Sequence, residues 1–248
     1  MSQSALLVLP GWATGDAIFG PLLARWDGDA AVADWGAAQE ADDLPRLALA
    51  SAEQLRGSFT LLGWSLGAMV ALEVAPRLLA RLDGLLLLAP CLRFTEGWPV
   101  RVLDRMRRRC RTDPEAVLDA FAPSLLSTSE AAEPRLDALP LRRDLPAAAL
   151  LAGLDYLAGR DLAAPALGAA GDLEVRVLHG SEDAVVSPAL SVALSERLGA
   201  ERLELAGAGH APHLTRPDEA AQFLFHSGRR AHGERREAQD AHREAHHD

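Results

Sequence analysis

A serine with a glycine two residues away on either side is the pattern with the clearest chemical meaning in this chain. Gly63-Trp64-Ser65-Leu66-Gly67 has the form G-x-S-x-G. The spacing suits a serine on a strained turn from a strand into a helix, because the glycines let the backbone turn without a Cβ clash. The apolar run Ser58–Gly63 predicts the strand, and Leu66–Ala75 predicts a helix that Pro76 ends. Ser65 is the candidate nucleophile; the alternative is a serine in an ordinary glycine-rich turn.

A serine hydroxyl is a weak nucleophile until a base takes its proton, so a histidine partner is expected. Such partners follow in the chain order serine, acid, histidine, each just after a later strand. His210 comes soon after the predicted strand Arg202–Leu205 and directly after Gly209. We therefore favour His210 as the base, and His213 is its rival. Either histidine could instead serve only in packing or capping.

The acid that would hold the imidazole is expected after the preceding strand. Asp183 follows the strand that contains Arg176–Leu178, within the segment Leu178-His179-Gly180-Ser181-Glu182-Asp183. Asp183 is favoured over its neighbour Glu182, whose side chain should point elsewhere. The alternative for Asp183 is an aspartate that caps the next helix. His179 is assigned a structural role.

Two backbone N–H groups are needed where negative charge develops on the attacked carbonyl oxygen. The amide of Leu66, directly after the nucleophile, is the first candidate. The second is expected in the loop Pro10-Gly11-Trp12, after the predicted strand Ala5–Leu9. We choose the amide of Trp12, whose indole would line the pocket. The alternative for Trp12 is a core aromatic residue.

The elements that must position these residues alternate between apolar strands and helices. Strands that are near-continuous apolar runs indicate a parallel sheet covered on both faces, here a doubly wound α/β sheet. Residues 1–90 and 171–226 are predicted to form this core, 91–170 a helical lid insertion, and 227–248 a disordered tail. Further strands are predicted at Ala31–Trp35, Leu85–Ala89 and around Arg176–Leu178, and further helices at Asp43–Leu55, Pro188–Leu198 and Pro217–Phe225.

Composition narrows the classes of partner. The 248 residues carry a net charge of −10, and every one of the 25 basic residues is arginine. An acidic chain is a poor binder of nucleic acid, and 2 cysteines are neither a disulfide framework nor a metal cluster. No leader peptide or membrane span is recognised, so we expect a cytoplasmic monomer that needs no metal or organic cofactor. Irregularly spaced histidines in the tail are not taken as a metal site: His232, His242, His246 and His247.

A run of arginines within the predicted lid is the exception to the acidic balance. Only Asp104 opposes it, and Arg142 and Arg143 add to it. Such a cluster could steer an acidic partner onto the lid, or it could be an ordinary solvated helix face. We select Arg101, Arg105 and Arg108 as the candidate docking residues. The run comprises Arg101, Arg105, Arg107, Arg108, Arg109 and Arg111.

Together these segments resemble α/β-hydrolases of the pimeloyl-[acyl-carrier protein] methyl ester esterase type, which serve biotin synthesis. The resemblance rests on Leu7–Trp12, Leu62–Gly67, Ala89-Pro90-Cys91 with Trp98-Pro99, Gly153-Leu154 with Asp161-Leu162, and Gly207–Pro212 leading into Thr215–Phe223. It departs where Pro10 replaces the family's histidine and where Glu115–Ala120 lacks the family's lid arginines.

The resemblance implies an α/β-hydrolase fold in which Ser65, Asp183 and His210 form the catalytic triad. It also implies that Trp12, Leu66 and Phe121 touch the substrate, with Phe121 on a lid helix. The implied activity is hydrolysis of the methyl ester of pimeloyl-[acyl-carrier protein]. The carrier protein could dock at this chain's own arginine run, which is not the family's set of lid arginines. A carboxylesterase of small esters or a thioesterase of the same fold is the alternative. A non-catalytic binding protein of this fold is disfavoured, because competent residues fill all three triad positions.

Overall fold

A parallel sheet organises the computed structural model, which describes residues 4–133, 136, 138–162 and 173–226. In this part of the chain the sheet has six strands in the order β2-β1-β3-β4-β5-β6, and every neighbouring pair is parallel. The doubly wound α/β sheet predicted from the sequence is confirmed. The strands are β1 (Ala5–Leu9), β2 (Ala30–Val32), β3 (Phe59–Trp64), β4 (Leu82–Leu88), β5 (Glu174–Gly180) and β6 (Glu201–Leu205).

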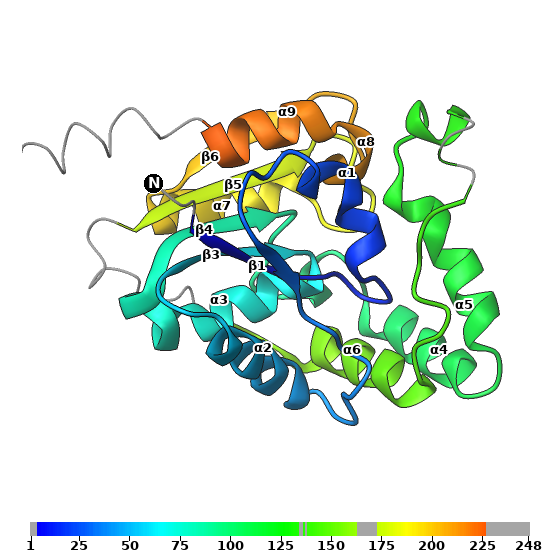
Figure 1. The fold of residues 1–248 in the computed structure, drawn as a ribbon. Coiled ribbons are helices and arrows are strands. Elements are labelled where there is room, and N and C mark those ends of the chain that lie inside the picture. The colour runs from blue at the N-terminus through cyan, green and yellow to red at the C-terminus, as the bar shows by residue number, and fades with distance from the viewer. Residues whose placement is uncertain (1–3, 134–135, 137, 163–172, 227–248) are drawn as a thin grey trace, which may run out of the picture.

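Helices cover both faces of this sheet, which is why the inner strands are apolar along nearly their whole length. Figure 1 shows α2 and α3 on one face, and α1, α8 and α9 on the other. Helix α7 packs against β5 and β6. The bounds are α1 (Gly20–Leu23), α2 (Asp43–Gln54), α3 (Leu66–Leu78), α7 (Pro188–Leu198), α8 (Pro212–Thr215) and α9 (Pro217–Ala221), and a π-helical turn spans Gln222–His226.

Several predicted element bounds differ from the structure. The helix predicted at Pro217–Phe225 ends at Ala221, where a π-helical turn follows, and the strand predicted at Leu85–Ala89 spans Leu82–Leu88. The strand predicted at Ala31–Trp35 is shorter, because only Ala30–Val32 pairs with β1. The helix after Ser65 does not end at Pro76 but continues to Leu78. A proline in the last turn of a helix costs one backbone hydrogen bond, and the apolar face of α3 buries Leu78 beyond it.

All the loops that carry candidate site residues leave the sheet at one edge. Parallel strands place their carboxyl ends together, and the register makes this explicit. Leu9 of β1 pairs with Gly63 of β3, Leu88 of β4 pairs with Leu178 of β5, and Gly180 pairs with Leu205 of β6. The turns that follow β1, β3, β5 and β6 therefore converge on the same side of the sheet.

Helices inserted between β4 and β5 lie beyond this carboxyl edge, where Figure 1 shows α4 and α5 side by side. They are α4 (Val100–Cys110), α5 (Pro114–Phe121) and α6 (Ala147–Gly159). Short 3₁₀ helices complete the described chain at Asp16–Phe19, Leu79–Arg81, Phe94–Glu96, Ala122–Leu125 and Glu130–Ala132. The predicted end of the insertion at 163–170 and the predicted tail at 227–248, with its histidines, lie outside the described residues.

Polar contacts attach this insertion to the core. The indole Nε1 of Trp12, after β1, donates to the carbonyl of Leu150 on α6 at 2.9 Å. The Tyr156 hydroxyl, also on α6, donates to the Glu73 carboxylate of α3 at 2.7 Å. Among the described residues, no helix has the length and apolar character required to cross a bilayer.

Candidate active site

Ser65 occupies a strained turn between β3 and α3. Its φ of 56° and ψ of −117° lie outside the regions that residues with a side chain normally adopt. A Cβ on Gly67 would stand 1.9 Å from the Leu9 carbonyl oxygen, and one on Gly63 would stand 2.5 Å from the Gly67 carbonyl oxygen. Both flanking glycines are therefore required by close backbone packing. The Ser65 amide donates to the Leu88 carbonyl at 2.9 Å, which holds the turn against β4.

Asp183 lies directly against His210. Its Oδ2 is 2.7 Å from Nδ1 of His210, and its Oδ1 accepts the amides of Val185 at 2.7 Å and Val186 at 2.9 Å. Burial disfavours ionisation of this carboxyl, but the His210 and His179 imidazoles outweigh it and lower the Asp183 pKa below its ordinary value. The neighbouring Glu182 is exposed. The carboxylate that can orient an imidazole here is that of Asp183.

The His210 ring is held at Nδ1 by Asp183, whereas its other nitrogen, Nε2, makes no hydrogen bond within the described chain. Its Nε2 is buried and has no hydrogen-bond partner among the described residues, so the Ser65–His210 hydrogen bond is not made in this structure. A hydrogen bond from a side chain to the backbone links the two regions: the indole Nε1 of Trp64, the residue before Ser65, donates to the His210 carbonyl at 2.8 Å. Catalytic hydrogen bonds commonly tighten only when substrate binds. With Asp183 on Nδ1 and Nε2 free, this arrangement is compatible with the predicted triad of Ser65, Asp183 and His210.

His213, the rival base, is enclosed by aromatic rings and does not reach Asp183. It stacks on Phe19 with ring centroids 4.6 Å apart and meets the edge of Trp64 at 4.5 Å. Neither of its ring nitrogens has a hydrogen-bond partner within the described chain. Burial, and then the nearby His210, lower the His213 pKa to about 3. His213 packs as a neutral side chain, so His210 is the better candidate for the base.

His179 touches the acid, a contact that the sequence analysis missed. Its Nε2 is 2.9 Å from Asp183 Oδ2 and 3.0 Å from the Val186 carbonyl oxygen. Because both of these oxygens can only accept, Nε2 carries the proton. One carboxylate oxygen thus receives two imidazoles, those of His179 and His210. The available signal was that His179 stands near the end of β5, four residues before Asp183.

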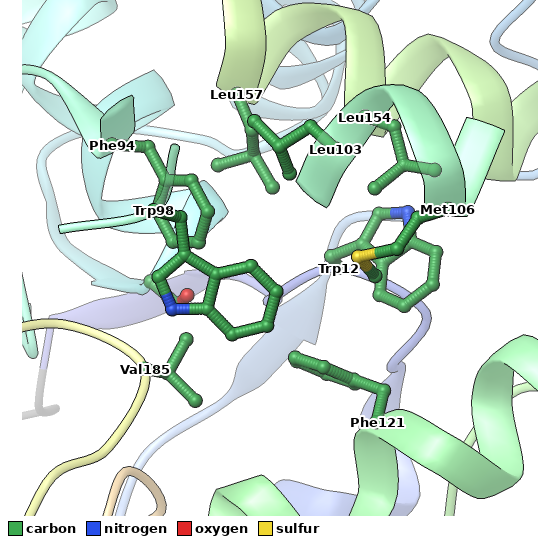
Figure 2. Close-up of a pocket in the computed structure, with 10 residues that line it drawn as sticks. Trp12, Phe94, Trp98, Leu103, Met106, Phe121, Leu154, Leu157 and Val185 are labelled. Carbon is green, nitrogen blue, oxygen red and sulfur yellow. The ribbon is translucent and has the colours of Figure 1, made fainter. Parts of the chain in front are cut away.

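A small cavity is lined by Ser65 and otherwise by apolar side chains, of which four are aromatic (Figure 2). Its volume is about 10 Å³, which is room for about one water molecule. The rings of Trp12 and Phe121 meet edge to face at 5.1 Å. The remaining lining residues are Phe94, Trp98, Leu103, Met106, Leu154, Leu157 and Val185.

Of the two residues expected to supply oxyanion donors, Trp12 lines this cavity, and Leu66 directly follows Ser65, which also lines it. Leu66 begins α3, so its amide is among those that open the helix towards the site. The Trp12 amide donates to no other backbone group of the described residues. The Trp12 indole is buried and is fixed by α6, where a Cβ on Gly153 would stand 2.6 Å from Trp12 Cδ1. Trp12 therefore lines the cavity and also packs as a core aromatic.

Metal-ligating side chains do not gather in this site. Over the described ranges, no group of three or more His, Cys, Asp or Glu side chains is arranged to hold a metal ion. Cys91 lies near Asp183, but burial, followed by the charges of Glu96 and Asp183, raises its thiol pKa to about 12. The nucleophile that this geometry offers is the hydroxyl of Ser65.

Comparison with known proteins agrees with this geometry. The model of the alpha/beta hydrolase family matches residues 6–223. The pimeloyl-[acyl-carrier protein] methyl ester esterase of Stenotrophomonas maltophilia (strain R551-3) is 32% identical over 89% of this chain and 91% of its own. The protein of the same name from Shewanella sp. (strain MR-7) is 30% identical over 88% of each chain.

Solved structures share the fold at lower sequence identity. The enol-lactonase from Burkholderia xenovorans LB400 has a TM-score of 0.74 and 19% identity, covering 89% of this chain and 90% of its own. A thermophilic esterase from Thermogutta terrifontis has a TM-score of 0.72 and 18% identity, covering 89% of this chain and 88% of its own. These likenesses establish the fold alone.

Replacement of the acid tests the Asp183–His210 pair. We expect Asp183→Asn to lower kcat for an activated ester by about 10³–10⁴-fold, because the imidazole loses the carboxylate that orients it and stabilises its protonated form. Glu182→Gln removes the same charge from the exposed neighbour and should leave kcat within about twofold of the wild type. Steady-state kinetics and a thermal melt of each protein supply the comparison. A folded Asp183→Asn enzyme with nearly full kcat would contradict the assignment.

Acid titration tests the neutral state of His213. The unfolded chain takes up this proton below pH ~6.5, whereas the folded protein does not until about pH 3, so its stability falls as pH drops through this window. Between pH 7.5 and 4.5, the wild type should lose roughly 2 kcal/mol more unfolding free energy than His213→Leu. Urea denaturation at both pH values measures this. Equal losses in the two proteins would mean that His213 titrates normally in the fold.

Proposed function

Because the chain belongs to the alpha/beta hydrolase family, we propose that it is a serine carboxylesterase acting on the methyl ester of pimeloyl-[acyl-carrier protein]. Hydrolase activity follows from the family and its esterase relatives. One observation supports this choice of substrate. Several relatives are named for this activity; they are about 30–36% identical to this chain, some of them over most of its length. The site supports the ester chemistry, and the arginine-rich face of α4 supports a carrier-borne substrate.

The proposed reaction uses the residues at the carboxyl edge in two steps. His210 Nε2 takes the proton of Ser65 Oγ as the oxygen attacks the ester carbonyl, and the amides of Trp12 and Leu66 stabilise the oxyanion. The carbonyl re-forms, the bond to the methoxy oxygen breaks, and His210 returns its proton to that oxygen to release methanol. Water, deprotonated by His210, then attacks the acyl-enzyme. The free acid departs and Ser65 regains its proton.

A larger groove on the lid offers a path to this chemistry. It lies between α4 and α5, has a volume of about 450 Å³, and shares Trp98, Met106 and Phe121 with the small cavity above Ser65. Figure 2 places these three side chains around one space. A shift of their side chains would join groove and cavity, which suits an extended acyl arm. Arg105 and Arg109 supply the groove's positive charge.

Three unpaired arginines on α4 support docking of an acidic carrier. Arg101, Arg105 and Arg108 are exposed and lie four and three residues apart, which places them on one face of the helix. Within the described residues they make no ion pair, whereas Arg107 pairs with Asp104 and Asp155, and Arg109 pairs with Asp113. A cluster of free cations on a chain of net charge −10 favours an acidic partner at this face.

Hydrolysis of small esters is the second candidate. The cavity above Ser65 has a volume of only about 10 Å³, so a short acyl group demands less side-chain movement than a pimeloyl chain. A thioesterase could use the same triad, and only its substrate would distinguish it from an esterase. Hydrolysis of small esters gives no role to the free arginines on α4.

The deciding assay compares two substrates with one protein. We expect purified protein to hydrolyse pimeloyl-carrier methyl ester with a kcat/KM at least ~100-fold above that for p-nitrophenyl acetate, since binding of the carrier adds to transition-state stabilisation. Ser65→Ala should abolish both activities and also labelling by a fluorophosphonate. Activity on the small ester alone would support the assignment as a serine hydrolase and would contradict the proposed carrier-linked substrate. Absence of Ser65 labelling in folded protein would indicate a non-catalytic binding protein.

If the carrier protein docks on α4, its binding should depend on the positive charge of that face. The triple variant Arg101→Ala, Arg105→Ala, Arg108→Ala should lower kcat/KM for the carrier-linked ester by about tenfold or more, because electrostatic steering is lost. Hydrolysis of p-nitrophenyl acetate should stay unchanged, and the wild-type carrier rate should fall as salt is raised.

A matched triple variant supplies the control for charge. Arg56, Arg77 and Arg197 are exposed arginines that follow or end α2, α3 and α7, away from the carboxyl edge. Their replacement by alanine removes the same charge and should leave both substrates unaffected. Equal losses in the two triple variants would assign the effect to net charge, and the docking face would then be wrong.

A further inference from the structure

A buried glutamate on the lid reaches the loop that carries the candidate base. Ser127-Thr128-Ser129-Glu130 forms a capping box at the start of the short helix Glu130–Ala132. The Ser127 hydroxyl accepts the Glu130 amide at 3.3 Å, and Glu130 Oε2 accepts the Ser127 amide at 2.9 Å. Capping-box glutamates usually lie in solvent, but Glu130 is 0% exposed. Local capping alone does not account for this burial.

The same carboxylate oxygen holds the residue before His210. Glu130 Oε2 accepts the Gly209 amide at 2.9 Å. The Leu125 carbonyl accepts the next two amides, those of His210 at 3.0 Å and Ala211 at 3.3 Å. The lid segment 125–130 thus binds consecutive amides on both sides of the base. We call this set of contacts the lid clasp: Leu125 O and Glu130 Oε2 as acceptors, and the amides of 209, 210 and 211 as donors.

Backbone packing makes this contact tight. A Cβ on Gly209 would stand 2.5 Å from the Ser127 amide nitrogen and 2.9 Å from Glu130 Oε2. Gly207, two residues earlier, has a φ of 74°, so the loop after β6 passes through a conformation that favours glycine. A loop with two glycines has little rigidity of its own. Its shape is set by its contacts with the lid, with Trp64 and with the loop after β5. In the last of these, Ser181 Oγ accepts the Gly207 amide and the Ala208 carbonyl accepts the Glu182 amide, each at 2.9 Å.

The Glu130 carboxyl is buried and, within the described part of the chain, forms no ion pair. Its second oxygen, Oε1, has no hydrogen-bond partner there. Burial of a polar group is costly unless hydrogen bonds compensate for it, so the two backbone amides on Oε2 are the contacts that hold this side chain in place. One of these amides, that of Gly209, belongs to the loop that carries His210.

We propose that Glu130 is a positioning residue for His210, through which the lid sets the place of the catalytic base. The proposal deepens the proposed function and rests on Ser65 and His210 performing ester hydrolysis. Displacement of a catalytic group by about 1 Å can lower the rate by ~100-fold. Loss of the hydrogen bond to the Gly209 amide is therefore expected to lower kcat. The lid is then part of the catalytic framework as well as a cover for substrate.

Three variants separate positioning from simple stability. Glu130→Ala removes the acceptor, Glu130→Gln keeps an oxygen for the two amides without the charge, and Glu133→Ala removes a carboxylate from the residue just after the same short helix. Glu133 pairs with Arg216 at 3.6 Å and lies outside the lid clasp. Each protein is assayed on p-nitrophenyl acetate for kcat and KM, and its melting temperature is measured.

The expected pattern is a loss in kcat alone. Glu130→Ala should lower kcat by about 10–100-fold with KM within about twofold, because the substrate pocket is unchanged while the base is misplaced. Glu130→Gln should recover kcat to within about fivefold of the wild type, since its oxygen can accept the Gly209 amide. Glu133→Ala should keep wild-type kcat. A folded Glu130→Ala enzyme with wild-type kcat would overturn the proposal.

A second route covers failure of Glu130→Ala to fold. Gly209→Ala leaves Glu130 in place but forces the base loop away from the lid, so it should reproduce the kcat loss; unchanged kcat there would also reject the proposal. The proposed function fails in a different manner. In that case the wild type itself shows no ester hydrolysis and no fluorophosphonate labelling of Ser65, whereas failure of the positioning role leaves both intact.

Discussion

The buried carboxylate of Asp183 is the interaction around which the carboxyl edge of the sheet is arranged. An ionised group that is cut off from water must have its oxygens occupied. Oδ1 takes the amides of Val185 and Val186, which shapes the turn after β5, and Oδ2 takes the imidazoles of His179 and His210. The loop after β6 is thereby drawn onto the loop after β5. A Cβ on Gly180 would stand 2.0 Å from the Gly209 carbonyl oxygen, which leaves no space for a side chain between them.

The inserted helices take part in this arrangement. Helix α6 fixes the indole of Trp12, the residue expected to supply an oxyanion donor, and the segment after α5 binds the amides around His210. The same insertion supplies Trp98, Met106 and Phe121 to the wall above Ser65. Movement of the lid would therefore alter substrate access and the geometry of the base together. Under the proposed role of Glu130, arrival of substrate and assembly of the site would be coupled.

The residues proposed to select the substrate and those proposed to catalyse hydrolysis lie in different parts of the molecule. Ser65, Asp183 and His210 lie at the carboxyl edge of the sheet, and the fold of that sheet is shared with solved structures of only 18–19% identity. The free arginines of α4 and the groove beside them belong to the insertion, where substrate choice can differ between proteins of one fold. The family is shown by the match of its model to residues 6–223, and the proposed acyl-carrier substrate draws its structural support from the lid.

The sequence by itself determined the parallel sheet, the turn at Ser65 and the order in which acid and base follow it, because these depend on local patterns: apolar runs, flanking glycines and positions after strands. It left His210 and His213 as rivals, gave His179 a structural role and contained no sign that Glu130 matters. The roles of these residues were decided by the tertiary structure, because each role depends on contacts between separate loops in a buried site. His213 stacks between Phe19 and Trp64, His179 reaches Asp183, and Glu130 meets Gly209 across 79 residues of chain. Local pattern carries no information about such long-range contacts, because they arise only when the strands are in register and the lid is folded over them.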